Sequence, residues 1–141
     1  MDLAWVMPIR TSDISQIMDW GINTPAFNGF WPEEVIHNFV KDGLSRGIYI
    51  GGPTIIGFVL AAYQPITKKL TWENAYLEPN YRKLDLGVIA FSEVWKEAVQ
   101  RGATFAEGLV EHSNHNPERI LLKSGFKDLG LYHWYHKTTA I

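Results

Sequence analysis

In this 141-residue sequence, residues that could bind a ligand lie at a turn between an expected strand and an expected helix. The strand is predicted over Lys69–Leu77, the run Pro79-Asn80-Tyr81 breaks it, and an amphipathic helix follows to about Arg101. Such a turn presents unpaired backbone N–H groups and the positive end of the helix dipole. Arg82 and Lys83 add basic side chains at the same place. The turn therefore suits an anionic ligand such as a diphosphate.

The rest of the sequence gives no indication of cysteine chemistry or of a metal site. The chain has no cysteine, which excludes disulfides, thiolate zinc sites, iron–sulfur clusters and cysteine nucleophiles. His112 and His115, with Glu111 beside them, lie where a strand is expected to become a loop, and no third ligand at a suitable spacing is evident. His133 and His136 are three residues apart in an expected strand and so point to opposite faces. We therefore expect no metal.

Size and composition narrow the class of protein. The length predicts one domain over residues 1–141, and 46% apolar with 20% charged residues is typical of a folded globular chain. A formal net charge of −2 favours neither nucleic acid nor an anionic membrane as a partner. The N-terminus lacks a signal-peptide pattern, and no apolar run approaches the length of a membrane span. We expect a cytoplasmic location.

The elements that must position the turn follow from hydrophobic periodicity and from the positions of Pro and Gly. Four helices are expected, over residues 12–21, 32–44, from after 81 to about 101, and 116–123. Seven strands are expected, over residues 3–9, 47–50, 54–63, 69–77, 103–110, 126–129 and 131–137. The order is β-α-α-β-β-β-α-β-α-β-β, which indicates an α+β fold.

Strict alternation along the strand at 69–77 assigns its side chains to two faces. One face carries Leu70, Trp72, Asn74 and Tyr76, and the other carries Thr71, Glu73, Ala75 and Leu77. Glu73 is therefore expected among small or apolar neighbours. A carboxylate in a cleft beside Trp72 and Tyr63 would have a raised pKa.

Two segments resemble those of a known family. The run Trp72-Glu73-Asn74-Ala75-Tyr76-Leu77-Glu78-Pro79-Asn80-Tyr81-Arg82-Lys83-Leu84-Asp85-Leu86-Gly87 resembles the signature segment of the GCN5-related N-acetyltransferase (GNAT) superfamily. The run Asn116-Pro117-Glu118-Arg119-Ile120-Leu121-Leu122-Lys123-Ser124-Gly125-Phe126 resembles its other hallmark, an Asn and then a helix ending in Lys-x-Gly-Phe. The expected element order matches this family over nearly the whole chain. The resemblance implies a three-layer mixed α/β fold. Its central, mostly antiparallel sheet of about seven strands splays between the fourth and fifth strands.

The resemblance also implies that acetyl-coenzyme A lies in that cleft as acyl donor. Its pyrophosphate would rest on backbone amides at the start of the long helix, and its pantetheine arm would hydrogen-bond the fourth strand. Position by position, the matching residues are Ala75, Tyr76 and Leu77 along the arm, and Arg82, Lys83, Leu84, Leu86, Gly87 and Val88 at the phosphate loop. Asn116 matches an asparagine near the pantetheine, and it is equally suited to be the N-cap of the following helix.

Glu73 matches a frequent family carboxylate on the fourth strand. Its role would be to deprotonate an ammonium group, directly or through a water, so that the free amine attacks the thioester. The alternative from spacing alone is a solvated acid on a strand. The aromatic residues Phe27, Phe30 and Trp31 lie where the family builds part of its acceptor site, although packing into the core is the favoured interpretation.

The sequence departs from the family pattern at two positions. Asp85 replaces the first glycine of the phosphate loop, where a side chain crowds the backbone and a carboxylate repels phosphates. It either stabilises the free helix as a first-turn acid, or occupies the place of a phosphate, or both. Leu121 stands where many members have a tyrosine that protonates the departing thiolate, and leucine cannot donate a proton.

The leading hypothesis is an acetyl-coenzyme A-dependent N-acetyltransferase that acts by direct attack of a primary amine on a small molecule or peptide. The alternative is a GNAT-fold chain that has lost catalysis and serves as a binding or structural module within a larger assembly. In either case the aromatic tail at 132–136 could contact a protein partner or a second copy in a homodimer. Asp85 and Leu121 favour the alternative, whereas the enzyme is favoured by Glu73, Arg82, Gly87 and Asn116.

Overall fold

The computed structural model describes residues 3–27, 29–110 and 115–131, together with 133, 135, 137 and 139. Along the chain it has β1 (Ala4–Pro8), α1 (Ile14–Asn23), α2 (Glu33–Asp42), β2 (Arg46–Ile50), β3 (Thr54–Gln64), β4 (Lys69–Leu77), α3 (Leu86–Arg101), β5 (Phe105–Gly108) and α4 (His115–Lys123). Three short 3₁₀ turns connect them: η1 (Thr11–Asp13), η2 (Pro25–Phe27) and η3 (Pro79–Leu84). This order confirms the α+β fold, and it matches the predicted order through α4.

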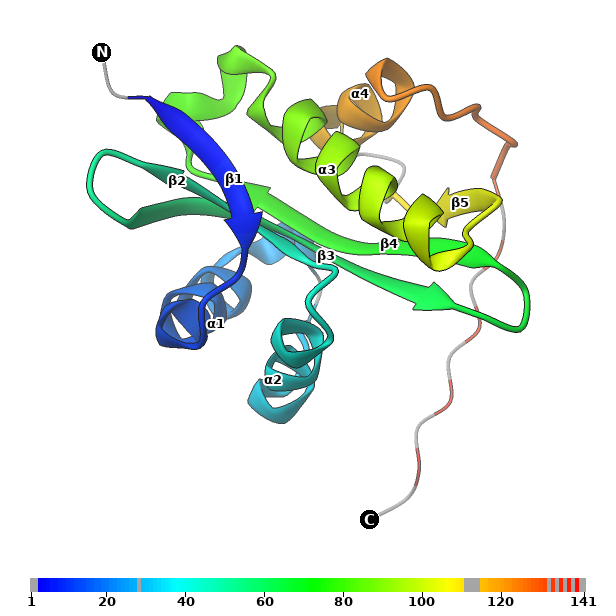
Figure 1. The fold of residues 1–141 in the computed structure, drawn as a ribbon, viewed down its shortest axis with the longest axis horizontal. Coiled ribbons are helices and arrows are strands. Elements are labelled where there is room, and N and C mark those ends of the chain that lie inside the picture. The colour runs from blue at the N-terminus through cyan, green and yellow to red at the C-terminus, as the bar shows by residue number, and fades with distance from the viewer. Residues whose placement is uncertain are drawn as a thin grey trace.

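The strands form one sheet in the order β1-β2-β3-β4-β5 (Figure 1). Neighbours from β1 to β4 are antiparallel, and β5 is parallel to β4, so the sheet is mixed and mostly antiparallel as predicted. Helices α1 and α2 cover one face, and α3 and α4 lie over the other (Figure 1). None of the helices in the described part of the chain is both long and apolar enough to cross a membrane.

The two closing strands predicted at 126–129 and 131–137 are wrong for the residues that the structure describes there. Residues 126–131, 133, 135 and 137 are not in strands, so the described sheet has five strands instead of about seven. The reason is burial. Phe126 packs on Phe91 with ring centroids 5.1 Å apart, but Leu129 and Leu131 are exposed, so the alternating pattern has no buried face to support it.

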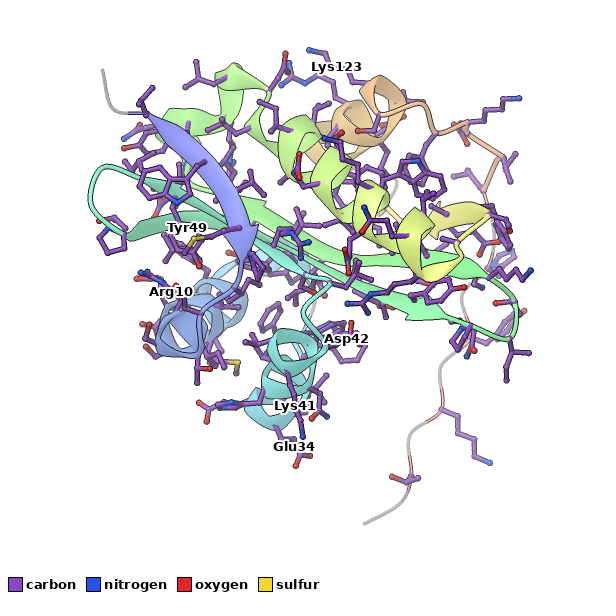
Figure 2. The ribbon with its side chains drawn as sticks, viewed as in Figure 1. Arg10, Glu34, Lys41, Asp42, Tyr49 and Lys123 are labelled. Atoms are coloured by element: carbon purple, nitrogen blue, oxygen red, sulfur yellow. The ribbon has the colours of Figure 1, made fainter. Side chains whose placement is uncertain are left out.

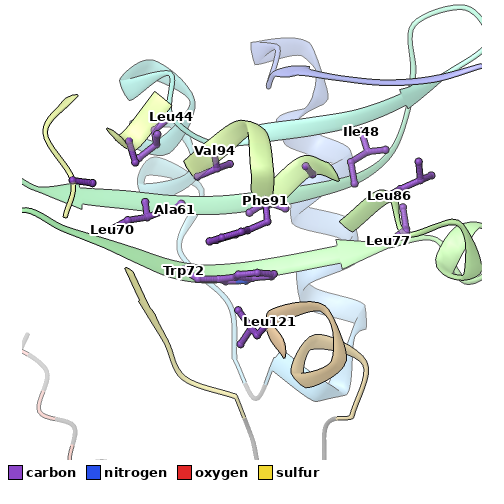
Figure 3. Packing of buried hydrophobic residues seen from close by; sticks show 14 of the residues in the cluster. Leu44, Ile48, Ala61, Leu70, Trp72, Leu77, Leu86, Phe91, Val94 and Leu121 are labelled. Carbon is purple, nitrogen blue, oxygen red and sulfur yellow. The ribbon is translucent and has the colours of Figure 1, made fainter. Parts of the chain in front are cut away.

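Two hydrophobic cores lie on the two faces of the sheet. On the α3 side, Trp72 stacks on Phe91 with ring centroids 4.8 Å apart, and Leu121 of α4 belongs to the same cluster (Figure 3). On the α1 and α2 side, Phe58 of β3 is fully buried with Ile17 and Ile36. Burial of large side chains on both faces supplies most of the driving force that holds the helices on the sheet.

A β-bulge interrupts β4 at Glu73. Leu60 of β3 pairs with Asn74, but the next residue, Ala61, pairs with Trp72, so Glu73 is an additional residue in the strand. One additional residue shifts the two-residue alternation of every side chain that follows.

The predicted strict alternation along β4 is therefore wrong after Trp72. Trp72 lies in the core on the α3 side together with Ala75 and Leu77, which the sequence pattern had placed on the opposite face. Tyr76 packs instead on the other side of the sheet, against Phe58 and Trp20.

A buried polar cluster fixes the start of the chain to β2. The Tyr49 hydroxyl donates a hydrogen bond of 2.8 Å to Asp13, and Nε of Arg10 donates another of 2.8 Å to the same carboxylate (Figure 2). Burial, reinforced by Asp13, raises the pKa of Tyr49 to about 12. The phenol therefore stays protonated at neutral pH and acts as a permanent donor.

Replacement of Gly57 by alanine tests the close packing of β3 on β4. Gly57 pairs with Leu77, and an added Cβ would lie 2.5 Å from the Tyr76 carbonyl oxygen. Because that oxygen is backbone, no rotamer change relieves the contact, and we expect Gly57→Ala to lower the free energy of unfolding by about 1–3 kcal/mol in urea titrations.

Gly52→Ala is the matched control. A Cβ at Gly52 would meet no described atom within 4 Å, so we expect a change within about 0.5 kcal/mol. Equal stability of the two variants would contradict the packing described here.

Candidate functional site

The candidate site is a cleft along the edge of β4, beside the start of α3. β5 pairs with β4 only over Lys69–Trp72, and the bulge at Glu73 follows at once. A bulge bends its strand, so the remainder of β4 diverges from β5. Residues 74–77 consequently have no partner strand on the β5 side among the described residues, and backbone groups on that edge are directed to the cleft.

A cavity of about 170 Å³ lies in this cleft. Its walls come from β4, the connection after it, the first turn of α3 and one face of α4, and the lining residues from these elements are Ala75, Tyr76, Leu77, Arg82, Asp85, Gly87, Arg119 and Ile120. A second wall, with Thr24, Phe27 and Phe58, comes from the segment after α1 and from β3. Five residues predicted from the sequence therefore meet at one cavity: Ala75, Tyr76, Leu77, Arg82 and Gly87.

The other predicted ligand-binding residues lie around the same turn. Leu84 is exposed, Leu86 is the buried first residue of α3, and Val88 is half-buried in the first turn of that helix. The prediction for these three residues is that backbone amides at this turn bind the pyrophosphate of the ligand, and it stays a prediction. The side chains of Lys83 and Asn116 lie outside the described part of the structure.

Two other sequence-based considerations also fall outside the described residues. The first is the set of possible metal ligands, of which Glu111, His112 and the side chain of His115 are not described. The second is the aromatic tail, of which positions 132, 134 and 136 are not described. Tyr135 of that tail is described, and its side chain is exposed.

Arg82 is anchored to the end of β4. Its Nε donates a hydrogen bond of 2.7 Å to the Leu77 carbonyl oxygen, and its guanidinium carbon lies 5.5 Å from the centre of the Tyr76 ring. Burial raises the pKa of Tyr76, with Glu78 adding to the shift and Arg82 opposing it. Arg82 thus holds the turn against the strand and places a fixed positive charge in the cavity wall.

Asp85 has a left-handed backbone, with φ 54° and ψ 25°. Glycine adopts this conformation at little cost, and aspartate is one of the few other residues found in it repeatedly. Asp85 therefore keeps the backbone turn at the position where the family pattern has glycine. Its carboxylate does not cap α3 but accepts a hydrogen bond of 2.9 Å from Nζ of Lys123.

Glu73 lies at the point where β4 leaves β5. Burial raises the pKa of its carboxyl group, and the nearby Lys69 opposes that shift. A carboxylate whose pKa is moved toward neutrality is better suited to accept and release a proton at physiological pH.

The aromatic loop before α2 packs into the core, as favoured from the sequence, and its part in an acceptor site stays a prediction. Phe27 and Phe30 pack on the buried Phe58, with ring centroids 6.4 and 6.1 Å away, so they belong to the core. Trp31 instead donates a hydrogen bond of 2.6 Å from Nε1 to the side chain of Asn74, the residue after the bulge. Phe27 also lines the cavity.

Arg119 is a cavity residue that sequence reasoning missed. The signal was available: Arg119 and Lys123 are four residues apart in a predicted helix and so share a face. Leu121, in contrast, is buried in the α3-side core, so the position of the family tyrosine is used here for packing.

Two substitutions at Asp85 isolate the left-handed backbone from the ion pair. Asp85→Gly and Asp85→Ala both remove the contact with Lys123, but only alanine is strained at a positive φ. We expect the alanine variant to melt on the order of 4 °C below the glycine variant in thermal unfolding followed by circular dichroism. Identical melting temperatures would show that the left-handed turn is not retained in solution.

Comparisons with known proteins give structural matches only. No protein-family model matches the sequence, and no curated protein matches it. Among solved structures, the ribosomal-protein-S18-alanine N-acetyltransferase from Escherichia coli has a TM-score of 0.73 at 19% identity, over 97% of this chain and 86% of that one. Diaminobutyrate acetyltransferase EctA from Paenibacillus lautus has a TM-score of 0.75 at 15% identity, over 87% and 75%.

A third match is the aminoglycoside N-acetyltransferase AAC(6')-Iy in complex with coenzyme A, with a TM-score of 0.74 at 12% identity, over 99% of this chain and 97% of that one. At such identities the likeness concerns the fold, and function has to be argued from the site. All three similar structures match this chain over 87% or more of its length with TM-scores of 0.73 to 0.75, so they share its overall fold. The chain has the fold of the GCN5-related N-acetyltransferase superfamily.

Proposed function

We propose that the cleft binds acetyl-coenzyme A and that the chain transfers its acetyl group to a primary amine on a small molecule or a peptide. The observation that carries this proposal is one continuous cavity that joins the open edge of β4 to the first turn of α3. An extended thioester arm needs a strand edge, and a diphosphate needs backbone donors with positive charge. The cavity offers both.

The turn into α3 supplies the anion site. The first amides of a helix have no partner within the helix, and here they belong to the segment that contains Leu86, Gly87 and Val88. Arg82 and Arg119 line the cavity beside them. Gly87 lets α4 approach closely, because a Cβ there would lie 2.8 Å from the Ile120 side chain. The described residues therefore fit a diphosphate, with Asp85 as the one opposing charge among those that line the cavity.

In the proposed chemical step Glu73 is the base. Glu73 is not among the residues that line the cavity, but it is two residues before Ala75, which is. Glu73 accepts a proton from the ammonium group of the acceptor, directly or through a water. The free amine then attacks the thioester carbonyl carbon to form the C–N bond, and a backbone amide of β4 stabilises the oxyanion of the resulting tetrahedral intermediate. Collapse of this intermediate breaks the C–S bond, and the remaining proton on the nitrogen passes to water or to the departing sulfur. The sulfur leaves as a thiolate, which Leu121 cannot protonate. A thiolate whose conjugate thiol has a pKa of about 8.5 is a good enough leaving group to depart without a general acid.

The similar structures support an amine as acceptor. One is a ribosomal-protein-S18-alanine N-acetyltransferase, and EctA is in complex with L-2,4-diaminobutyric acid and coenzyme A. A second candidate function, binding without catalysis, is favoured by the carboxylate of Asp85 at the cavity wall and by the burial of Leu121 in the core. That candidate predicts a complex with acetyl-coenzyme A, or with a protein partner, but no transfer.

Glu73→Gln tests the base. We expect turnover in an assay of coenzyme A thiol release, with a panel of primary amines, to fall by about 10²–10⁴, while the KM for acetyl-coenzyme A changes little. The carboxylate is the active form, so the wild-type rate should rise with pH through the raised pKa of Glu73. The variant should lose that rise.

Glu107→Gln is the matched control, because Glu107 is an exposed acid on β5 that pairs with Lys69 at 3.4 Å. It should keep most of the activity. Full activity of Glu73→Gln would remove Glu73 as the base. A wild-type chain that binds acetyl-coenzyme A but acetylates no amine in the panel would favour the non-catalytic function.

A further inference from the structure

At the mouth of the cavity, defined here as the exposed part of its wall at Asp85, an ion pair joins two distant segments. Asp85 lines the cavity, whereas Lys123 lies beside it, outside the lining residues. The carboxylate of Asp85, at the junction of η3 and α3, accepts a hydrogen bond of 2.9 Å from Lys123 at the end of α4. Figure 2 shows Lys123 at the outer end of that helix. Both side chains are about half exposed, at 51% and 46%. The contact therefore lies at the surface, where a ligand can reach it and compete for either partner.

Two cations of α4 act on the Asp85 carboxylate. Lys123 holds the pKa of the Asp85 carboxyl below its usual range, and the charge of Arg119 acts in the same direction. Nη2 of Arg119 also donates a hydrogen bond of 3.4 Å to the Arg82 carbonyl oxygen, which places the α4 cations against the turn. The Asp85 carboxylate thus lies within the influence of two cations of α4, Arg119 and Lys123, and a third cation, Arg82, lines the same cavity. Clustered cations of this kind are suited to bind a phosphate.

The carboxylate has no capping role that would account for its place. Asp85 is the N-cap residue of α3, but its side chain makes no capping hydrogen bond. The only side-chain hydrogen bond described for it is the one to Lys123. Its negative charge therefore acts across the cavity mouth, on α4, instead of along its own helix.

From this arrangement we propose that Asp85 is an autoinhibitory competitor for the anionic part of the ligand, and that Lys123 becomes a phosphate contact once Asp85 is displaced. The inference rests on the proposed binding of acetyl-coenzyme A. A diphosphate that enters the mouth must take Lys123 from Asp85 and tolerate the carboxylate nearby. The ion pair therefore lowers affinity, and neutralising Asp85 alone raises it.

The test compares four chains by calorimetric titration with acetyl-coenzyme A at low salt: wild type, Asp85→Asn, Lys123→Met and the double variant. Asparagine keeps the left-handed backbone and removes the charge. We expect Asp85→Asn to bind about tenfold or more tightly and Lys123→Met to bind about tenfold more weakly. The double variant, which removes both charges, should return to within about threefold of wild type.

Lys96→Met is the control for a general loss of positive charge. Lys96 pairs with Glu93 at 3.1 Å within α3; the Lys96 side chain is exposed and Glu93 is partly buried. Its affinity should match wild type. The advantage of Asp85→Asn should also shrink as salt is added, because the effect is electrostatic at a surface site.

The outcomes separate the two proposals. Wild-type binding with no gain in Asp85→Asn would overturn the competitor role of Asp85 and leave the proposed function standing. Absence of binding in every folded variant at millimolar acetyl-coenzyme A, Asp85→Asn included, would overturn the proposed function itself. Inorganic pyrophosphate, titrated in parallel, should show the same order of affinities if the competition concerns the phosphates.

Discussion

The rest of the site depends on one additional residue in β4. Because Glu73 has no partner on β3, the strand turns its following side chains to new faces and diverges from β5. Trp72, just before the bulge, is committed to the α3-side core, and Asn74, just after it, receives the Trp31 hydrogen bond. The bulge therefore places a half-buried carboxylate, an open strand edge and an aromatic loop within a few residues of one another.

The turn into α3 combines a left-handed backbone with a negative charge. Asp85 adopts a conformation that glycine adopts at little cost, so an aspartate can stand where the family pattern has glycine without loss of the left-handed turn. What changes is the electrostatics, because a carboxylate now meets the cations of α4. The left-handed turn and the charge at this position are therefore separable, because a neutral asparagine can adopt the same backbone conformation.

Local patterns predicted the elements well, and long-range relations explain what they missed. Pro32 before the acids of α2 and Gly102 after α3 mark helix ends in sequence and in structure alike. The bulge at Glu73 leaves little local signal, because the two successive polar residues Glu73 and Asn74 fit either register. The apolar character of Ala75 and Leu77 is the one local indication that these side chains face the core. Alternation near the C-terminus suggested strands, but Leu131 is exposed and no buried face supports them. The pairing of Asp85 with Lys123 joins segments far apart in sequence, which spacing rules do not address.

Hydrogen exchange of backbone amides, with and without saturating acetyl-coenzyme A, tests most directly whether the open edge of β4 and the start of α3 form one binding site. A single binding site along β4 and α3 should slow exchange in peptides that cover residues 74–77 and 86–88, with little change in α2. Unchanged exchange in both segments, in a folded sample at millimolar ligand, would contradict it.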